Sequence, residues 1–324
     1  MAPSASLRNI LAYAGNLFSQ VPLQLSDVPN PLAPFLGPTD PTTTTTTAAA
    51  AAGTGIVDPV TPYIPLSGAP TCPIDGPTSC NNQTSADSCC FVHPGGRLLL
   101  TQFWDEETHV GGVGDGLDRT RPLVSGLKKI LTALRQPDLC DGSYDQFCGM
   151  TPRFNNITAI LKHYEQDELL GYMSRYWVAK YGTNEHLWEH EYNKHATCIN
   201  TLAPSCYGDA YKPGLEVVDY FERAFGLFRQ LDTYYALQQS GIEPSSSKTF
   251  DLAVVQQVLE RFSGGRVILK CGGRRRDRLH EAWYVYFVKG SLQSGQFVPA
   301  SDSFKGDQGN CAKRIKYLPK RKKY

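Results

Sequence analysis

The sequence predicts an α+β fold stapled by disulfides. Three observations lead to this class: helical spacing of apolar residues in mid-chain, apolar runs typical of strands near both ends of the folded part, and ten cysteines. Helices grouped between strands differ from the alternating strand and helix order of a parallel sheet. No internal repeat is visible. A chain of 324 residues with 41% hydrophobic residues is long enough to bury a sizeable core.

The N-terminal part is expected to lie outside the folded domain. Residues 1–24 contain Arg8 followed by a short apolar run, which fits a signal peptide or a leader. Residues 25–71 hold many prolines and the tract PTTTTTTAAAAAG. This composition cannot build a core, so it predicts a flexible linker that could carry O-linked glycans. The folded domain is expected over residues 72–311.

Within this domain the elements can be predicted in order. RLLLTQFW, residues 97–104, is a mostly apolar run typical of a buried strand. Three segments then show helical spacing of apolar residues: 155–170, 214–231 and 251–262. Residues 266–272 and 282–290 have the composition of strands. GLKKILTALRQ, residues 126–136, is predicted as a short amphipathic helix.

The C-terminal residues 312–324 are strongly basic and lack an apolar pattern, so we expect a solvated tail. Such a tail could hold an RNA backbone electrostatically. The cluster Arg274-Arg275-Arg276 with Arg278 lies between the last two predicted strands and is expected in an exposed turn. The net charge of +1 favours no class of partner, and no stretch approaches the roughly 20 apolar residues of a membrane span.

The cysteines indicate the compartment. Their number is even and none belongs to a CxxC pair, which favours structural disulfides over a zinc ribbon. Such a set is typical of a secreted or lumenal protein. Two Asn-x-Thr sequons, at Asn82 and Asn156, are compatible with glycosylation in that compartment.

The segment WEHEYNKHATC, residues 188–198, is the candidate site. His190 and His195 are five residues apart, about 140° around a regular helix, so we do not expect them to share a metal ion. This spacing argues against a metallohydrolase. Glu191 with His195, and His190 with Lys194, are the pairs that share a helix face. A histidine beside a carboxylate, with cations next to it, suits proton transfer on a phosphodiester. The alternative is a solvated helix with chance histidines.

The same segment resembles the second signature motif of the ribonuclease T2 family, F-W-x-H-E-W-x-K-H-G-T-C. The matching positions are Trp188, His190, Glu191, Lys194, His195, Thr197 and Cys198, and the departures are Leu187, Tyr192 and Ala196. The resemblance extends over about residues 72–311, with SCCFVHPGGRLLLTQFWD and CDGSYDQFC as further matching segments. It implies a central antiparallel sheet packed with helices. It also implies five disulfides: Cys72–Cys90, Cys80–Cys140, Cys89–Cys206, Cys148–Cys198 and Cys271–Cys311.

The resemblance further implies a function. Members of the family cut single-stranded RNA through a 2′,3′-cyclic phosphate, need no metal, usually prefer acidic pH, and are secreted, vacuolar or lysosomal. We expect a monomer of this kind. The implied catalytic residues are His195 as an acid/base group, Glu191 and Lys194 as stabilisers of the transition state, and His190 as a phosphate ligand. The implied substrate-binding residues are Tyr144, Asp138, Gln102 and Trp188. Leu187 replaces an aromatic residue of the family's base site.

One half of the family's site is missing. The first motif, W-x-I-H-G-L-W-P-D, contains the second acid/base histidine, and no His-Gly-Leu-Trp occurs in this chain. Only Pro137, Asp138 and Cys140 match the motif's end, and the abrupt change over residues 105–136 suggests a translated intron or a frame error. His109 is the only histidine there. It could substitute as the second acid/base group, but no motif surrounds it, so we expect a histidine in an exposed loop. The alternative function is therefore a catalytically inactive protein of this fold that binds RNA or a protein partner.

Overall fold

A computed structural model describes residues 72–73, 75–80, 88–104, 134–140, 142–179, 181–301 and 308–319, with the backbone alone at 134–138. The predicted leader and linker lie outside the described residues. So do residues 105–133, which include His109 and most of the segment that departs from the family. All that follows concerns the described part of the chain.

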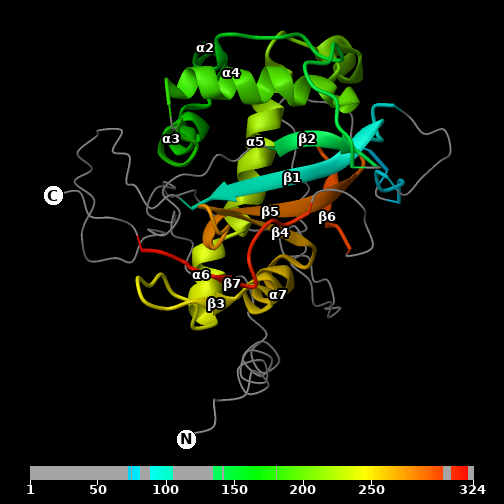
Figure 1. The fold of residues 1–324 in the computed structure, drawn as a ribbon. Helices are drawn as coiled ribbons and strands as arrows, with labels where there is room; N and C mark the ends of the chain where they lie inside the picture. The colour runs from blue at the N-terminus through cyan, green and yellow to red at the C-terminus, as the bar shows by residue number, and fades with distance from the viewer. Residues whose placement is uncertain are drawn as a thin grey trace, which may run out of the picture. The chain divides into compact units, whose positions relative to one another are not determined.

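An antiparallel sheet of five strands forms the centre of this part (Figure 1). The strands are β1 (Gly95–Phe103), β2 (Leu134–Leu139), β4 (Val267–Gly272), β5 (Arg278–Lys289) and β6 (Gln296–Pro299). Their order is β2-β1-β5-β4, and β6 also pairs with β5. The strand predicted at residues 97–104 is β1, in the middle of the sheet. The two strands predicted near the C-terminus are β4 and β5.

Strand β1 is buried on both faces. Leu98 and Leu100 belong to the large apolar core that the helices share, whereas Leu99 packs with Ile268 and Val285 on the other face. The alternation follows from the two-residue period of a strand. Burial on both faces explains why its sequence is a nearly continuous apolar run.

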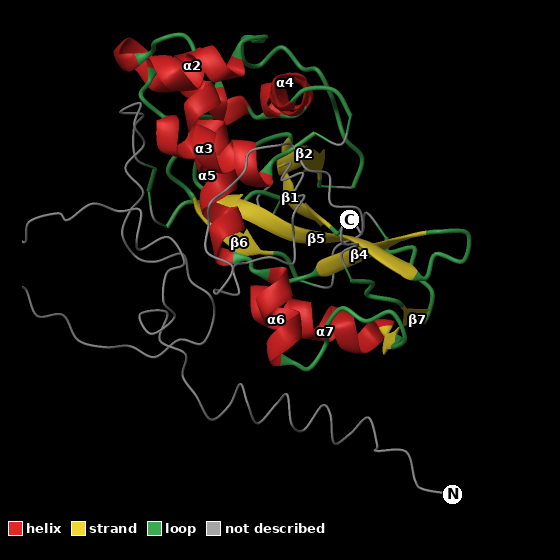
Figure 2. Ribbon diagram, turned by 90° about the vertical axis from the view of Figure 1, so that its left-hand side faces the viewer, coloured by secondary structure: helices red, strands yellow, loops and turns green. Residues whose placement is uncertain are grey.

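Six α-helices lie within the described residues: α2 (Ile157–His163), α3 (Asp167–Tyr176), α4 (Asn184–Lys194), α5 (Leu215–Gln230), α6 (Thr233–Gln239) and α7 (Leu252–Ser263). All six contribute to the apolar core on one face of the sheet. In Figure 2, α2, α3 and α4 lie toward the β2 edge of the sheet, and α6 and α7 lie toward the β4 edge. Helix α5 runs beside the sheet and contacts β1. The α+β class with a central antiparallel sheet is confirmed. No helix in this part of the chain is long and apolar enough to cross a membrane.

The helix predicted over residues 155–170 is two helices. Helix α2 ends at His163, and Glu165 takes a positive φ of 56°. The Gln166 N–H then donates to the Leu161 carbonyl oxygen at 2.8 Å, which is how a left-handed residue closes a helix C-terminus. Helix α5, by contrast, extends over the predicted segment, and the apolar positions that predicted it are buried.

Residues 134–136 correct a sequence prediction. The amphipathic helix expected over 126–136 is wrong for these three residues, because they begin β2 and pair with β1. Pro137 follows within the same strand. Proline has no N–H to donate, and β2 tolerates it because it is an edge strand of the sheet. Residues 126–133 lie outside the described part.

Residues 313–319 are not the solvated tail that the sequence suggested. Strand β7 (Arg314–Ile315) pairs with β3 (Phe250–Asp251), and Ile315 and Tyr317 are fully buried. The Tyr317 ring packs on Trp104, whose indole N–H donates to the Leu318 carbonyl oxygen at 2.8 Å. The buried Ile315 and Tyr317 alternate with the exposed Arg314 and the half-buried Lys316, as a strand requires, and the high charge hid this pattern.

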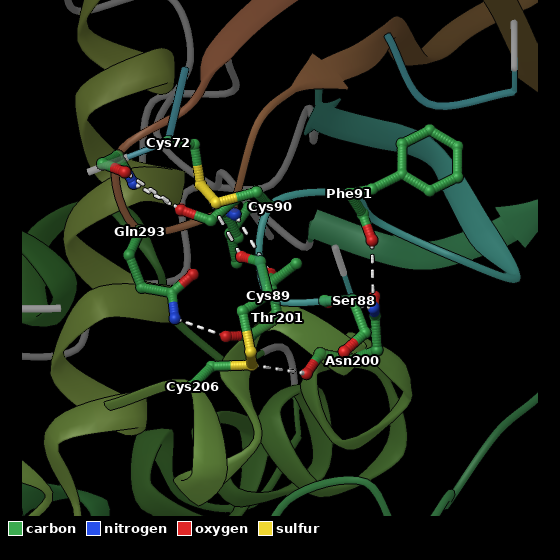
Figure 3. Close-up of a disulfide and its surroundings, with 12 residues drawn as sticks. Cys72, Ser88, Cys89, Cys90, Phe91, Asn200, Thr201, Cys206 and Gln293 are labelled. Atoms are coloured by element: carbon green, nitrogen blue, oxygen red, sulfur yellow. Dashed lines mark hydrogen bonds between the residues drawn. A yellow bond between two sulfur atoms is a disulfide. The ribbon is translucent and has the colours of Figure 1, made fainter. Parts of the chain in front are cut away.

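All five disulfides that the resemblance implied are formed. Figure 3 shows the bridge between Cys89 and Cys206. Beside it, the Asn200 side-chain amide donates to the carbonyl oxygens of Ser88 (2.6 Å) and Phe91 (3.0 Å). The loop that follows α4 is therefore fixed to the segment that leads into β1.

Candidate active site

Helix α4 carries the predicted catalytic residues. Its first turn is capped by Thr183, whose hydroxyl accepts a backbone hydrogen bond. Trp188, Glu191 and Tyr192 are buried along one face, and His195 continues that face just past the helix end. This is the spacing of residues that share a helix stripe. The side chains of Glu191 and His195 therefore point into the protein interior, together with those of Trp188 and Tyr192.

Glu191 and His195 form a buried acid–base pair. The Glu191 Oε2 atom lies 3.8 Å from His195 Nε2. The two residues are only 5% and 2% exposed, so water screens their interaction little. A carboxylate in this position stabilises the imidazolium form of the histidine. The i, i+4 pairing that the sequence predicted is confirmed.

His190 completes the cluster from the exposed side. Its ring centroid lies 6.3 Å from that of His195, with the two planes almost perpendicular. The sequence argument against a shared metal assumed one regular helix through both histidines. His195 departs from that regular geometry: it is the C-cap of α4 and has a φ of −110°, although its N–H still donates to the Glu191 carbonyl oxygen at 3.1 Å. One donor atom each from His190, Glu191 and His195 lies within 4.8 Å of the others.

This donor set has the chemistry of a transition-metal site. Two imidazoles and a carboxylate are ligands that Zn²⁺ takes in proteins. Among the described residues, no other group of three or more His, Cys, Asp or Glu side chains converges in this way. Helical geometry therefore does not exclude a metal, and the expected independence from metal stays a prediction.

A second segment, residues 142–154, is fastened to the end of α4. The Cys148–Cys198 disulfide joins it to the turn after His195. Farther along, the Asn193 side chain accepts from the Phe154 N–H at 2.9 Å and donates to the Phe154 carbonyl oxygen at 2.6 Å. The middle of this segment is thus held to the turn after α4, and its end is held to the last turn of α4 itself.

This attachment puts an aromatic side chain, that of Phe147, at the cluster. The Phe147 N–H donates to the Lys194 carbonyl oxygen at 3.0 Å, and its ring contacts His190 edge-on at 6.2 Å. The Arg153 guanidinium lies 5.6 Å from the same ring. Phe147 is 43% exposed and Tyr144, three residues earlier, is 55% exposed. Exposed rings beside cations offer stacking faces for nucleobases.

Phe147 and Arg153 were not predicted from the sequence. The sequence held a signal for Phe147, because this residue directly precedes Cys148. The implied bridge from Cys148 to Cys198 predicts that Phe147 lies close to His195. Arg153 had no comparable signal.

Two predicted substrate-binding residues lie in the interior. Trp188 is 3% exposed, and its indole N–H donates to the Trp177 carbonyl oxygen at 2.8 Å. Gln102 is 1% exposed; its amide donates to the Leu231 carbonyl oxygen at 2.7 Å and accepts from the Thr233 hydroxyl. Neither side chain presents a face or a free amide edge to a base. The structure therefore corrects the prediction that both contact the substrate.

The remaining predicted residues are placed as follows. Asp138 belongs to β2, where its backbone pairs with Arg97. The structure describes only the backbone of this residue. Strand β2 contacts α4 and the turn after it. Lys194 is half-buried at the last turn of α4, and Leu187 is half-buried against the core.

The fold and the cluster define a class of protein: a disulfide-stapled α+β domain with an acid–base site at the end of one helix. Comparison with known proteins gives the family. A profile of the Ribonuclease T2 family matches residues 95–311. Ribonuclease T2 from Aspergillus oryzae is 43% identical over 254 residues, which are 78% of this chain and 85% of that protein.

Two further proteins that this chain resembles are also T2 ribonucleases or carry a ribonuclease name. Ribonuclease Trv from Hypocrea rufa is 41% identical over 252 residues, 78% of this chain and 99% of that protein. The crystal structure of Actibind, a T2 ribonuclease, matches with a TM-score of 0.64 and 36% identity, over 78% of this chain and 100% of that one. The chain belongs to the Ribonuclease T2 family, and its class is that of the T2-type endoribonucleases.

Proposed function

We propose that the protein cleaves single-stranded RNA by transphosphorylation. In this reaction the ribose 2′-oxygen attacks the adjacent phosphorus, the bond from phosphorus to the 5′-oxygen breaks, and a 2′,3′-cyclic phosphate remains. The step needs a base for the 2′-OH proton, an acid for the departing 5′-oxygen, and cations for the charge on phosphorus. The observation that carries the proposal is the convergence of His190, Glu191 and His195 at the end of α4.

In this proposal each member of the cluster has its own role. His195 transfers the proton, and Glu191 orients it and stabilises its charged form. His190 is exposed and Lys194 half-buried, and in this proposal these two side chains meet the phosphate. Phe147 and Tyr144 stack on bases, with Asp138 at the same base site.

The mechanism also needs a second proton-transfer group. The histidine of the family's first motif cannot supply it here, because the sequence contains no His-Gly-Leu-Trp. Among the described histidines, His190 is the one whose ring contacts His195. In this chain His190 would therefore serve as the second acid/base group. Loss of one dedicated group costs about 10²–10⁴-fold in rate, so we propose an impaired but measurable activity.

The proposal includes a secretory route to the outside of the cell or to the vacuole, because the five disulfides need an oxidising compartment. A leader at residues 1–24 and a linker at 25–71 precede the domain. Asn156 is exposed at the start of α2 and is a glycan acceptor in this proposal. The protein acts as a monomer and without a metal.

The test is His195→Ala, with His186→Ala as the matched control. His186 is on the same helix, and its side chain is 82% exposed. His195→Ala should lower the rate of RNA cleavage by about 10²–10⁴-fold, whereas His186→Ala should leave it unchanged. Both variants are assayed with and without a chelator, and the cyclic phosphate is identified by mass spectrometry. Equal rates in all three proteins would mean that a contaminant cleaves the RNA. Activity lost with the chelator would refute the metal-free mechanism.

A second candidate is a catalytically inactive protein of the same fold that binds RNA or a protein partner. The missing His-Gly-Leu-Trp favours it. Sequencing of the spliced transcript across the codons for residues 105–140 decides between the two. A W-x-I-H-G-L-W-P-D segment in the transcript would restore the two-histidine mechanism. A transcript that encodes the printed residues would favour the inactive protein.

A further inference from the structure

Two basic segments far apart in the sequence meet at one end of the sheet. The first is residues 273–279, which are the turn between β4 and β5 and the start of β5, and the second is residues 312–316, which contain β7. The Cys271–Cys311 disulfide joins the two. The Ala312 N–H donates to the Arg276 carbonyl oxygen at 2.8 Å, and the Lys316 N–H donates to the Asp277 carbonyl oxygen at 2.6 Å.

The side chains of these segments concentrate positive charge. Seven basic residues belong to them: Arg274, Arg275, Arg276, Arg278, Lys313, Arg314 and Lys316. We call them the C-terminal basic surface. Lys316 is half-buried, and the other six are exposed. The whole chain carries a net charge of only +1, so this is a local concentration.

Among the described residues, Asp277 and Asp251 are the acids that contact this surface, and these two leave most of its charge uncompensated. Asp277 pairs with Lys316 at 3.1 Å. Asp251 stands opposite Arg314 in the β3–β7 pair, where its carboxylate accepts from the Ala253 N–H and caps α7. Arg314 is itself fixed, because it donates to the Thr249 carbonyl oxygen at 2.8 Å and to the Thr249 hydroxyl at 2.9 Å.

The chemistry of the surface indicates its ligand. Its segments contain no aromatic residue, and their large apolar side chains, Leu279 and Ile315, are buried. A membrane site normally adds an apolar face to its charges, and a protein interface adds apolar or aromatic anchors. Guanidinium and ammonium groups alone suit a chain of phosphates, which they bind without reading bases.

The surface is remote from the cluster on α4. In both views α4 lies beyond the β2 edge of the sheet, while β7 lies beyond the opposite edge, which β4 forms (Figures 1 and 2). A short substrate at α4 therefore cannot reach β7, but a long flexible strand can contact both.

We propose that the C-terminal basic surface binds the phosphate backbone of single-stranded RNA and holds long substrates while the α4 cluster acts on them. This inference rests on the proposed function for the identity of the polyanion. Binding at the surface is independent of base sequence and depends steeply on salt, because each neutralised phosphate releases counterions.

The test is Arg274→Gln, Arg275→Gln and Lys313→Gln in one full-length protein. These side chains are exposed, come from both segments, and leave the Asp277–Lys316 pair and the Thr249 contacts intact. The control is Lys162→Gln, Lys212→Gln and Arg261→Gln, three exposed cations outside the surface that remove the same charge. A 2′-O-methyl oligoribonucleotide is the ligand, because it cannot be cleaved and its binding is measured apart from activity.

For the surface variant we expect the slope of log K against log salt to fall by about 2, and the affinity at low salt to fall by about 10-fold. The control should bind like the parent protein. Cleavage of a dinucleotide should be unchanged in both, whereas cleavage of long RNA at subsaturating concentration should slow in the surface variant alone.

Three other outcomes would overturn this inference, and a fourth would overturn only the proposed function. Equal losses in both variants would mean that net charge, not this surface, attracts RNA. Unchanged oligonucleotide binding in the surface variant would refute the proposal that this surface binds RNA. Loss of binding to vesicles with anionic lipids, with RNA binding intact, would assign the surface to membranes. Loss of oligonucleotide binding with no cleavage by any of the proteins would keep this inference and refute the proposed function. Equal unfolding temperatures exclude misfolding as the cause.

Discussion

Glu191 Oε2 and His195 Nε2 lie 3.8 Å apart in the interior of the domain, one helical turn from each other. The turn that separates them is the last of α4, so His195 sits where the helix gives way to a different backbone conformation. That position gives the histidine two neighbours at once: the carboxylate below it on the stripe and the exposed His190 beside it. The chemistry of the site depends on this helix end.

The carboxylate of Glu191 should matter through its charge. Glu191→Gln keeps the size of the side chain and removes the charge that favours the imidazolium of His195. We expect kcat to fall by about 10²-fold, a typical effect for one electrostatic group, with little change in KM. Glu189→Gln is the control, since Glu189 is on the same helix but faces the exposed His186 at 3.9 Å. A similar loss of kcat in both variants would assign the effect to the helix rather than to the pair.

The ring of Phe147 should contribute to substrate binding. Phe147→Ala removes an exposed aromatic face beside His190 and Arg153. Stacking on a base contributes about 1–3 kcal/mol, so we expect KM to rise by about 10-fold with kcat nearly unchanged. Tyr235→Ala removes another exposed ring, on α6, and should leave KM as it is. An unchanged KM in Phe147→Ala would leave Tyr144 as the stacking residue.

Burial of Glu216 should make the fold more stable in acid. This carboxyl is fully buried, and burial raises its pKa above the ordinary 4.5, against the hydrogen bonds from Tyr211 and Gly214 that lower it. A raised folded-state pKa means that the stabilising contribution is complete below about pH 4.5 and is lost as pH rises through the folded pKa. Burial raises the pKa of Glu222 and Asp232 in the same direction.

Thermal unfolding should therefore occur at lower temperature near pH 7 than near pH 5. Glu216→Gln imitates the protonated carboxyl, since its amide can donate to the Tyr211 oxygen and accept from the Gly214 N–H. The variant should unfold at higher temperature than the parent near neutral pH and should depend less on pH. Glu243→Gln, in the exposed loop after α6, is the control and should keep the parent's dependence. An unchanged pH dependence in Glu216→Gln would mean that other groups cause it.

The sequence predicted what local periodicity determines. Strand β1 and helix α5 follow directly from the spacing of their apolar residues, and the Glu191–His195 pair follows from i, i+4 geometry. The disulfide pairs came from the resemblance to a family and not from the spacing of the cysteines. These predictions concern contacts within one element or contacts shared by a whole family.

The sequence failed where a distant part of the chain decides the outcome. Residues 134–136 have helical spacing, but pairing with β1 makes them a strand. Phe147 reaches His190 only because a disulfide and one backbone hydrogen bond hold it to the end of α4. The approach of His190 to His195 depends on where α4 stops, and helix ends are the least certain part of a prediction from sequence.

The contribution of strand β7, which the sequence did not predict, can be measured by truncation. Truncation after Ala312 removes Ile315 and Tyr317, which are 0% and 2% exposed, together with the Leu318 carbonyl that binds the Trp104 indole. Truncation after Pro319 removes only residues outside the described part. Each buried side chain of this size contributes about 1.5–3 kcal/mol, so the longer truncation should lower the free energy of unfolding by about 3–6 kcal/mol.

The shorter truncation should leave the unfolding free energy unchanged, and both proteins keep the Cys271–Cys311 bridge, so the comparison isolates the strand. Chemical denaturation with the disulfides intact measures the difference. Equal stability of the two truncated proteins would mean that β7 adds nothing to the core, and that residues 313–319 behave in solution as the basic tail their composition suggested. A large difference would show that a run of charged residues can conceal a structural strand when only every second side chain is buried.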